Sequence, residues 1–105
     1  MKIESVKENV NFKRAYYQGK SAVTKLMVVY WRKNKLGKKR LGLTVSKKLG
    51  NSPKRNRVRR ILREGVRRQF HLLPEGCDFI IVARSAAVTA KSTEIEALLK
   101  EIFSA

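Results

Sequence analysis

Acidic residues are scarce in this chain of 105 residues, which has 8 aspartates and glutamates, 25 lysines and arginines, and a formal net charge of +17 at pH 7. This imbalance excludes an acidic, solvating protein and makes a polyanion the expected partner. Cys77 is the only cysteine, so an internal disulfide and a cysteine-rich zinc site are excluded. A reducing compartment fits this cysteine usage, and we expect the protein to be cytoplasmic.

Long hydrophobic runs are also absent. No stretch approaches the roughly 18 apolar residues that a membrane-spanning helix needs, so we expect no membrane association. Residues 1–7 are polar and no apolar run follows them, so we expect no signal peptide. There is no internal repeat, low-complexity tract or linker, and 43% of the residues are hydrophobic, which is enough for one core. We therefore predict a single domain over residues 1–105.

Residues that commonly carry catalysis are few. The single histidine, His71, stands beside Phe70 at a predicted helix end, where a surface or partly packed residue is expected more often than a general base. Cys77 borders an apolar strand, a position typical of a buried, inert thiol. The acids form no cluster that could hold two metal ions, and there is no glycine-rich phosphate loop. We predict neither a catalytic residue nor a metal site, so that a partner does any chemistry in which this chain takes part.

The spacing of the apolar residues predicts the order helix, strands, helix, strand, helix. A short helix should begin at Asn9 or Asn11 and run to about residue 18, with Gly19 as its stop. The later elements are strands over 23–32, 41–46 and 79–83, a long helix over 54–70, and a last helix capped by Ser92 or Thr93. The last helix should bury Ile95, Leu98, Leu99 and Ile102. This order predicts a sandwich with a single sheet, of the α+β or the α/β class. We assign the chain to the α+β class.

The predicted helix over 54–70 is strongly amphipathic. Its apolar face is formed by Val58, Ile61, Leu62, Gly65, Val66 and Phe70, and its opposite face by Asn56, Arg60, Arg63 and Arg67. Arg59 flanks the apolar face on one side, and Arg57 and Arg68 flank it on the other. Gly65 costs about 1 kcal/mol in helix propensity, and we expect it to allow close packing on the sheet.

The charge on this helix is of one sign. Arg63 lies four residues from both Arg59 and Arg67, and each such pair of like charges costs roughly a few tenths of a kcal/mol. Glu64 is the only acid in the middle third of the chain, so little of this repulsion is compensated locally. A solvated charged face is the plain alternative, but a polyanion that neutralises the face explains the pattern better. Guanidinium groups suit bidentate contacts to phosphate, and Asn56 suits a base edge or a sugar. We predict that this helix binds nucleic acid.

Tyr30 and Trp31 lie on opposite faces of their predicted strand because side chains alternate. In the strand over 41–46, the apolar residues face the core. The other face of that strand is small and polar, and consists of Gly42, Thr44 and Ser46. If Tyr30 and the helical stripe of Phe12 and Tyr16 border this face, the result is a groove lined with rings, which suits a single-stranded nucleic acid. The alternative, in which these aromatic residues belong to the core, stays open.

The chain carries two adjoining motifs, SKKLGN over 46–51 and KRNRVRRILRE over 54–64. Together they closely resemble the signature of the protein subunit of bacterial ribonuclease P. The flanks are similar as well, since residues 11–19 look like the first helix of that family and residues 78–84 look like its last strand. The resemblance covers nearly the whole chain, and its central motif is long and specific. Tyr16 stands where phenylalanine is common in the family, and stacking should survive this change.

The resemblance implies a function and two partners. That family pairs with a large catalytic RNA and removes the 5′ leader from precursor tRNA. The RNA carries the catalysis and mainly holds the Mg²⁺ ions, and the protein does not cut. No obligate protein partner is implied. The family's fold also contains a left-handed strand–helix–strand crossover, against the strong right-handed preference of such connections.

The resemblance also assigns two sets of binding residues. For the catalytic RNA the set is Arg55, Asn56, Arg57, Arg59, Arg60, Arg63, Arg67 and Lys48. For the single-stranded leader the set is Phe12, Tyr16, Tyr30, Ser46, Lys47 and Arg84. The N-terminus carries Glu4 and Glu8 rather than a dense basic arm, so we expect no strong RNA contact there.

Three other functions are compatible with the charge. A ribosomal or general RNA-binding protein would show no preference for tRNA that bears a leader. A DNA-binding protein would place the basic helix in the major groove, but no dimerisation element or helix-turn-helix partner is visible. A protein-only nuclease would need the carboxylate cluster that the sequence lacks.

Overall fold

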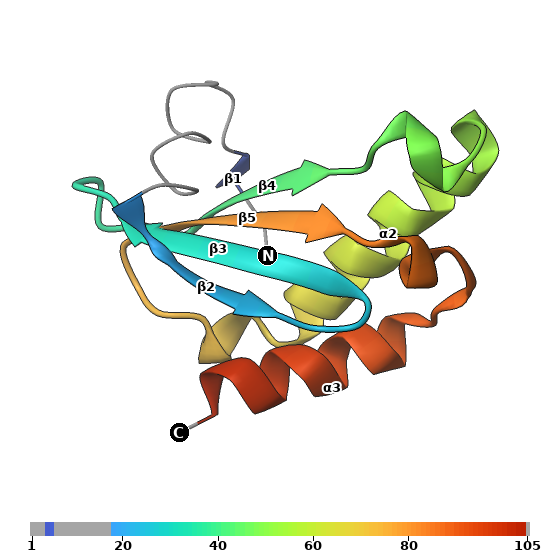
Figure 1. Cartoon of the computed structure of the whole chain (residues 1–105). Coiled ribbons are helices and arrows are strands. Elements are labelled where there is room, and N and C mark those ends of the chain that lie inside the picture. The colour runs from blue at the N-terminus through green and yellow to red at the C-terminus, as the bar shows by residue number, and fades with distance from the viewer. Residues whose placement is uncertain (1–3, 6–17, 105) are drawn as a thin grey trace.

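The computed structural model of the chain describes residues 4–5 and 18–104 (Figure 1). The strands are β1 (Glu4–Ser5), β2 (Lys20–Val23), β3 (Met27–Lys33), β4 (Arg40–Thr44) and β5 (Cys77–Ala83). The α-helices are α2 (Ser52–Arg68) and α3 (Ser92–Phe103), and the short 3-10 helices are η1 (Lys47–Leu49), η2 (Phe70–Leu72) and η3 (Ser85–Thr89). The short helix predicted to end near residue 18 falls almost wholly outside the described residues.

The strands form one mixed sheet with the order β1-β4-β5-β3-β2. β4 runs parallel to both β1 and β5, whereas β3 is antiparallel to both β5 and β2. The chain leaves β4, passes through α2 behind the sheet and returns into β5, which lies below β4 in the view of Figure 1. Because both strands point to the right in that view, this connection is left-handed, as the resemblance implies. The prediction of an α+β fold with a single sheet is confirmed.

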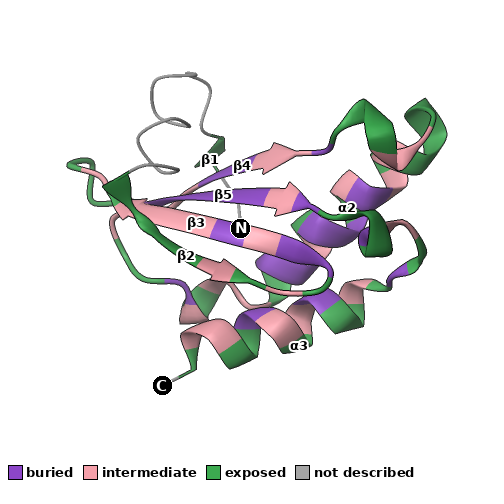
Figure 2. Cartoon of the chain, viewed as in Figure 1, coloured by how far each residue is buried: buried purple, intermediate pink, exposed green. Residues whose placement is uncertain are grey.

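One face of the sheet packs against both helices and contains the core (Figure 2). On this face, Val29 of β3 lies opposite Ile81 of β5, and both side chains are fully buried. Leu62 of α2 and Ile95 of α3 belong to the same hydrophobic cluster and are also fully buried. Burial of each such side chain contributes about 1.5–3 kcal/mol to folding. The core therefore fixes the position of α2 against the sheet.

The predicted buried faces of the two long helices are largely confirmed. The buried residues of α2 are Val58, Ile61, Leu62, Gly65 and Val66. In α3, Leu98 and Ile102 are only partly buried, whereas the two other predicted residues are fully buried. A Cβ atom at Gly65 would lie only 2.5 Å from Cγ2 of Ile95, so this glycine allows α2 to approach α3. The expectation that Gly65 serves packing on the sheet is wrong.

The sequence predicted one strand over 23–32, which corresponds to β3 and the turn before it, and β2 was not predicted. β2 ends at Val23, and a turn over residues 24–26 leads into β3. Thr24 closes this turn, because its backbone N–H and its hydroxyl donate to the carbonyl of Met27 at 2.9 and 2.7 Å. The Thr24 hydroxyl also accepts from the N–H of Met27 at 3.0 Å. The prediction failed because the turn contains none of the glycine, proline, asparagine or aspartate residues by which turns are recognised.

Two further features differ from the prediction. The cap of α3 is Lys91 rather than Ser92 or Thr93, and its backbone N–H donates to the carboxylate of Glu94 at 3.1 Å. β1 was not predicted, because a strand of two residues carries no detectable alternation. Neither helix in the described part of the chain is long and apolar enough to cross a membrane.

Candidate RNA-binding surfaces

The exposed side of α2 carries the polar residues that the sequence placed there. We call this surface the arginine face, and it consists of Asn56, Arg60, Arg63 and Arg67. Arg60 and Arg63 are exposed, and neither forms an ion pair with any described residue. The side-chain oxygen of Asn56 accepts from Nη1 of Arg59 at 2.9 Å. Two guanidinium groups are therefore available to an external anion.

Glu64 compensates the charge at the C-terminal end of α2. Its carboxylate accepts hydrogen bonds from Arg67 at 2.6 and 3.2 Å and from Arg68 at 2.9 Å. The hydrogen bonds from Arg67 and then Arg68 lower the pKa of Glu64 to about 2. The expectation that Glu64 supplies local compensation is confirmed for these two arginines, while Arg60 and Arg63 lie outside its reach.

Two arginines of the predicted RNA-binding set are held by the protein itself. Arg57 is half-buried, and its guanidinium donates to the carbonyls of Val88 and Ala90, each at 2.8 Å. Arg57 therefore ties α2 to η3 and the residue after it, a role that the sequence did not reveal. Arg55 is half-buried as well, with Nη2 donating to the Ser52 hydroxyl at 3.3 Å. RNA contacts by these two arginines stay predictions.

We call the sheet face that points away from α2 and α3 the second face. Tyr30 of β3, Ile80 of β5 and Gly42 of β4 are aligned in one row across it. The next row toward the C-terminal ends of β4 and β5 holds Val28, Val82 and Thr44. Both rows are uncharged, and in the first of them Ile80 is fully buried and Gly42 is buried as well, whereas Tyr30 is half-buried. Tyr30 lies on the opposite face of β3 from Trp31, as alternation predicted, but Ile80 of β5 separates it from Gly42 of β4, and its place in a leader groove stays a prediction.

Three more residues of the predicted leader-binding set lie at one end of the second face. Ser46 and Lys47 follow β4, and Arg84 follows β5, so the parallel pairing puts all three at the same edge of the sheet. Lys47 and Arg84 are exposed, and Nη1 of Arg84 donates to the carbonyl of Thr24 at 2.9 Å. The hydroxyl of Ser46 accepts from the N–H of Lys48 and caps η1, which the sequence did not predict. Two cations thus stand at the end of the second face that adjoins its uncharged rows.

The two candidate surfaces adjoin at η1. This short helix begins directly after Ser46, and α2 begins three residues after it ends. Lys48 is exposed within η1, between the surfaces. Phe12 and Tyr16 lie outside the described residues, so their predicted place in a groove on the second face stays a prediction.

A charged row lies next to the row of Tyr30 on the second face. Asp78 of β5 is 6% exposed and stands between Arg32 of β3 and Arg40 of β4. Its carboxylate accepts from Nε and Nη2 of Arg40, both at 2.7 Å, and from Nδ2 of Asn34 at 2.8 Å. The sequence did not single out this cluster, because its members are brought together only by the register of the strands.

The residues considered for catalysis have ordinary surroundings. His71 is exposed in η2. Cys77 is 5% exposed, and this burial raises the pKa of its thiol, so the expectation of a buried thiol is confirmed. Within residues 4–5 and 18–104, no three histidine, cysteine, aspartate or glutamate side chains are grouped closely enough to hold a metal ion.

Known proteins resemble this chain over most of its length. A family model described as Ribonuclease P matches residues 1–105. The ribonuclease P protein component of Clostridium acetobutylicum is 39% identical over 105 residues, which cover 98% of this chain and 88% of the relative. That of a Thermoanaerobacter species is 44% identical over 89 residues, which cover 85% of this chain and 77% of the relative.

Solved structures agree in fold as well as in sequence. The RNase P protein of Staphylococcus aureus is 34% identical with a TM-score of 0.83, covering 98% of this chain and 94% of the other. The RNase P protein of Thermotoga maritima is 27% identical with a TM-score of 0.82, covering 95% of this chain and 94% of the other. The chain therefore belongs to the family of ribonuclease P protein components, whose general role lies in the 5′ processing of tRNA.

Proposed function

We propose that this chain is the protein subunit of a bacterial ribonuclease P and that it acts by binding rather than by cutting. The arginine face docks on the catalytic RNA, and the second face holds the single-stranded 5′ leader of precursor tRNA. The RNA carries the catalysis and mainly holds the Mg²⁺ ions, so this chain supplies cations and a surface for bases. The complex works in the cytoplasm and needs no further protein partner.

The observation that carries this proposal is that η1 connects the elements that carry two different surfaces. One is the arginine face, with the free guanidinium groups of Arg60 and Arg63. The other is the second face of the sheet, which has two uncharged rows and Lys47 and Arg84 at its end. A structured RNA needs dense phosphate contacts, whereas a single strand needs stacking and a few cations along its backbone. The described part of the chain offers both kinds of surface, and η1 connects the elements that carry them.

Binding of this kind affects processing in two ways. Because mature tRNA lacks the leader, contacts on the second face strengthen binding of the precursor and not of the product. Cations on the arginine face neutralise phosphates of the catalytic RNA, which lowers the concentration of Mg²⁺ that the complex requires. Neither effect requires a catalytic group on the protein.

The proposal is tested by binding of precursor and mature tRNA to the complex of this chain with a ribonuclease P RNA. Phe12→Ala should weaken binding of the precursor by about 1–3 kcal/mol, the contribution of one base stacked on an aromatic ring. Binding of mature tRNA should not change. Leu36→Ala serves as the control, because Leu36 is an exposed apolar residue in the turn before β4.

Two results would contradict the proposal. An equal loss for precursor and mature tRNA would make Phe12 a core residue rather than part of a leader site. A wild-type complex that binds both RNAs equally would favour a general RNA-binding protein.

A further inference from the structure

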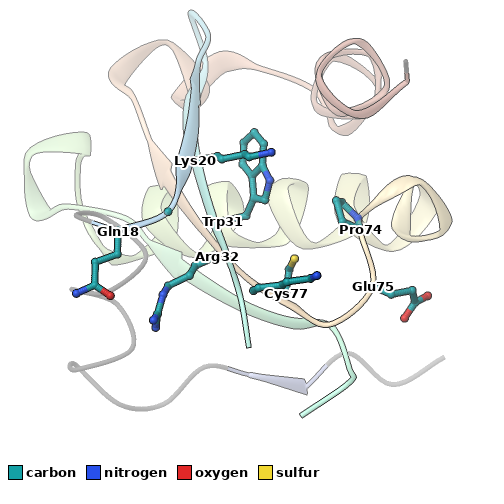
Figure 3. Close-up of a pocket in the computed structure, with 9 residues that line it drawn as sticks. Gln18, Lys20, Trp31, Arg32, Pro74, Glu75 and Cys77 are labelled. Atoms are coloured by element: carbon teal, nitrogen blue, oxygen red, sulfur yellow. The ribbon is translucent and has the colours of Figure 1, made fainter. Parts of the chain in front are cut away.

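A hollow of about 630 Å³ opens on the helix-facing side of the sheet, near its β2 edge (Figure 3). Trp31, Cys77 and Pro74 provide its apolar lining, and Lys20 and Lys33 provide cations. This volume lies within the range of about 300–1,000 Å³ that is usual for small-molecule sites. None of these five residues belongs to the arginine face or to the second face, although Arg32 of the charged row also lines the hollow.

The register of the strands builds the hollow. Lys20 of β2 lies opposite Trp31 of β3, and Lys33 lies two residues further along β3, opposite Cys77 of β5. Alternation along the strands therefore puts the indole, the thiol and both lysines on one face of the sheet. In Figure 3, Trp31 and Cys77 project into the same space, with Pro74 across from the indole.

The indole is fixed but not covered. Its ring packs edge-on against Phe103 of α3, with ring centroids 4.9 Å apart and an interplanar angle of 67°. Trp31 nevertheless stays partly exposed, and its exposed part lines the hollow. A ring held in this way offers a ligand a preformed aromatic surface, so little side-chain entropy is lost on binding.

The charge around the hollow favours an anion. Lys20 and Lys33 are exposed, and neither has an ion-pair partner within the described part of the chain. Burial raises the pKa of the Cys77 thiol, and the positive charges of Lys33 and Lys20 oppose this rise. Glu75 is the acidic residue at the rim, and it is paired with Lys39 at 3.4 Å.

We propose that this hollow binds one unpaired nucleotide of RNA, with the base against Trp31 and Pro74 and the phosphate at Lys20 and Lys33. Every base has an apolar ring face that stacks on an aromatic side chain, and an ammonium group pairs with its phosphate. The inference rests on the proposed function, because it takes RNA as the partner. It adds a third contact at the end of the sheet opposite to Arg84, since Trp31 pairs with Phe79 near the start of β5 and Arg84 follows its end.

The single tryptophan makes the test direct. Trp31 is the only tryptophan of the chain, so tryptophan fluorescence reports on the surroundings of this one ring. A 5′-phosphorylated single-stranded trinucleotide of adenosine should quench this fluorescence in a saturable way. Lys20→Ala combined with Lys33→Ala should raise the dissociation constant about tenfold, the loss expected for charge-assisted contacts to one phosphate. Lys35→Ala combined with Lys100→Ala removes the same charge from exposed positions outside the hollow and should leave the constant unchanged.

Other outcomes overturn the inference. No quenching, or quenching that the Lys20 and Lys33 variant leaves unchanged, would show that the hollow does not bind a nucleotide. Equal quenching by adenosine monophosphate and by the trinucleotide would assign the hollow to a free nucleotide instead of RNA.

The same Lys20 and Lys33 variant is then tested for binding of precursor and mature tRNA. If the hollow fails its test while the preference for the precursor persists, the proposed function stands without it. If the wild-type protein binds neither the trinucleotide nor precursor tRNA, both proposals fall.

Discussion

Asp78 of β5 and Arg40 of β4 are joined by two hydrogen bonds of 2.7 Å, one row away from Tyr30 on the second face. The Asp78 carboxylate is 9% exposed and the Arg40 side chain is 19% exposed, so the pair is shielded from solvent. Asn34 donates a third hydrogen bond to the same carboxylate. This cluster connects β3, β4 and β5 at the end of the second face opposite to Lys47 and Arg84.

Replacement of Asp78 should destabilise the fold in a pH-dependent way. Burial alone would raise the pKa of Asp78, but hydrogen bonds from Arg40 and Asn34 outweigh this effect and lower the pKa below its ordinary value of 3.8. A carboxylate with a lowered pKa stabilises the folded state above its unfolded pKa, and this contribution is lost as the pH falls through the folded value.

Asp78→Asn should therefore lower the free energy of unfolding by about 3 kcal/mol at neutral pH and by progressively less below about pH 4. Urea unfolding at several pH values measures this difference. Glu75→Gln is the control, because Glu75 is exposed and its pair with Lys39 should contribute at most about 1 kcal/mol. A difference between wild type and Asp78→Asn that stays constant into the acid range would contradict this assignment.

Arg57 and Arg60 should differ in what their removal affects. Arg57→Ala removes two hydrogen bonds from a guanidinium to backbone carbonyls, so it should lower the free energy of unfolding by about 1.5–3 kcal/mol. Arg60→Ala removes an exposed side chain and should change stability by less than about 0.5 kcal/mol. Equal effects of the two substitutions in denaturant unfolding would argue against a structural role for Arg57.

The arginine face should determine how RNA binding depends on salt. Arg60→Ala combined with Arg63→Ala should weaken affinity for ribonuclease P RNA and reduce the slope of log K against log salt, by about 0.7 for each single-stranded phosphate that is no longer neutralised. Affinities measured over a range of salt concentrations give this slope. Lys35→Ala combined with Lys100→Ala removes the same net charge elsewhere and provides the comparison. A slope that stays at the wild-type value would show that this face does not meet phosphates.

Gly65 should resist replacement by alanine although it lies within a helix. An added Cβ would lie 2.5 and 2.8 Å from two side-chain atoms of Ile95, so the helices would have to separate. Gly65→Ala should therefore destabilise the protein by about 1–3 kcal/mol, the usual effect of overpacking, despite better helix propensity. Ala97→Gly at an exposed position of α3 is the reverse control and should cost about 1 kcal/mol. Thermal unfolding compares the two, and a stabilised Gly65→Ala would contradict the close approach of the helices.

Local sequence patterns predicted the long helices and most of the strands of this fold. The apolar face of α2 repeats over several turns, so its period is clear and its buried residues were identified correctly. The turn between β2 and β3 was missed because Thr24 closes it with a side-chain hydroxyl, which leaves no mark in composition. The left-handed connection between β4 and β5 followed only from the family resemblance, since the general preference is for the opposite hand.

For the candidate surfaces, as for the fold, the sequence predicted which side chains are exposed but not which distant residues they contact. Helical periodicity placed Arg60 and Arg63 on the exposed side of α2, and strand alternation placed Tyr30 away from the core. Periodicity did not show that Arg57 is held by the carbonyls of the segment that contains η3, because that interaction spans more than 30 residues of sequence. For the same reason it did not show the pairing of Asp78 with Arg40.

Cleavage of precursor tRNA at low Mg²⁺ tests most directly whether this chain is a non-cutting protein subunit. The assay combines a bacterial ribonuclease P RNA with 5′-labelled precursor tRNA, in the presence and in the absence of this protein. We predict that the leader is released only when the RNA and the protein are both present. Cleavage by the protein alone would contradict a binding role, and no stimulation despite tight RNA binding would show that the chain is a general RNA-binding protein.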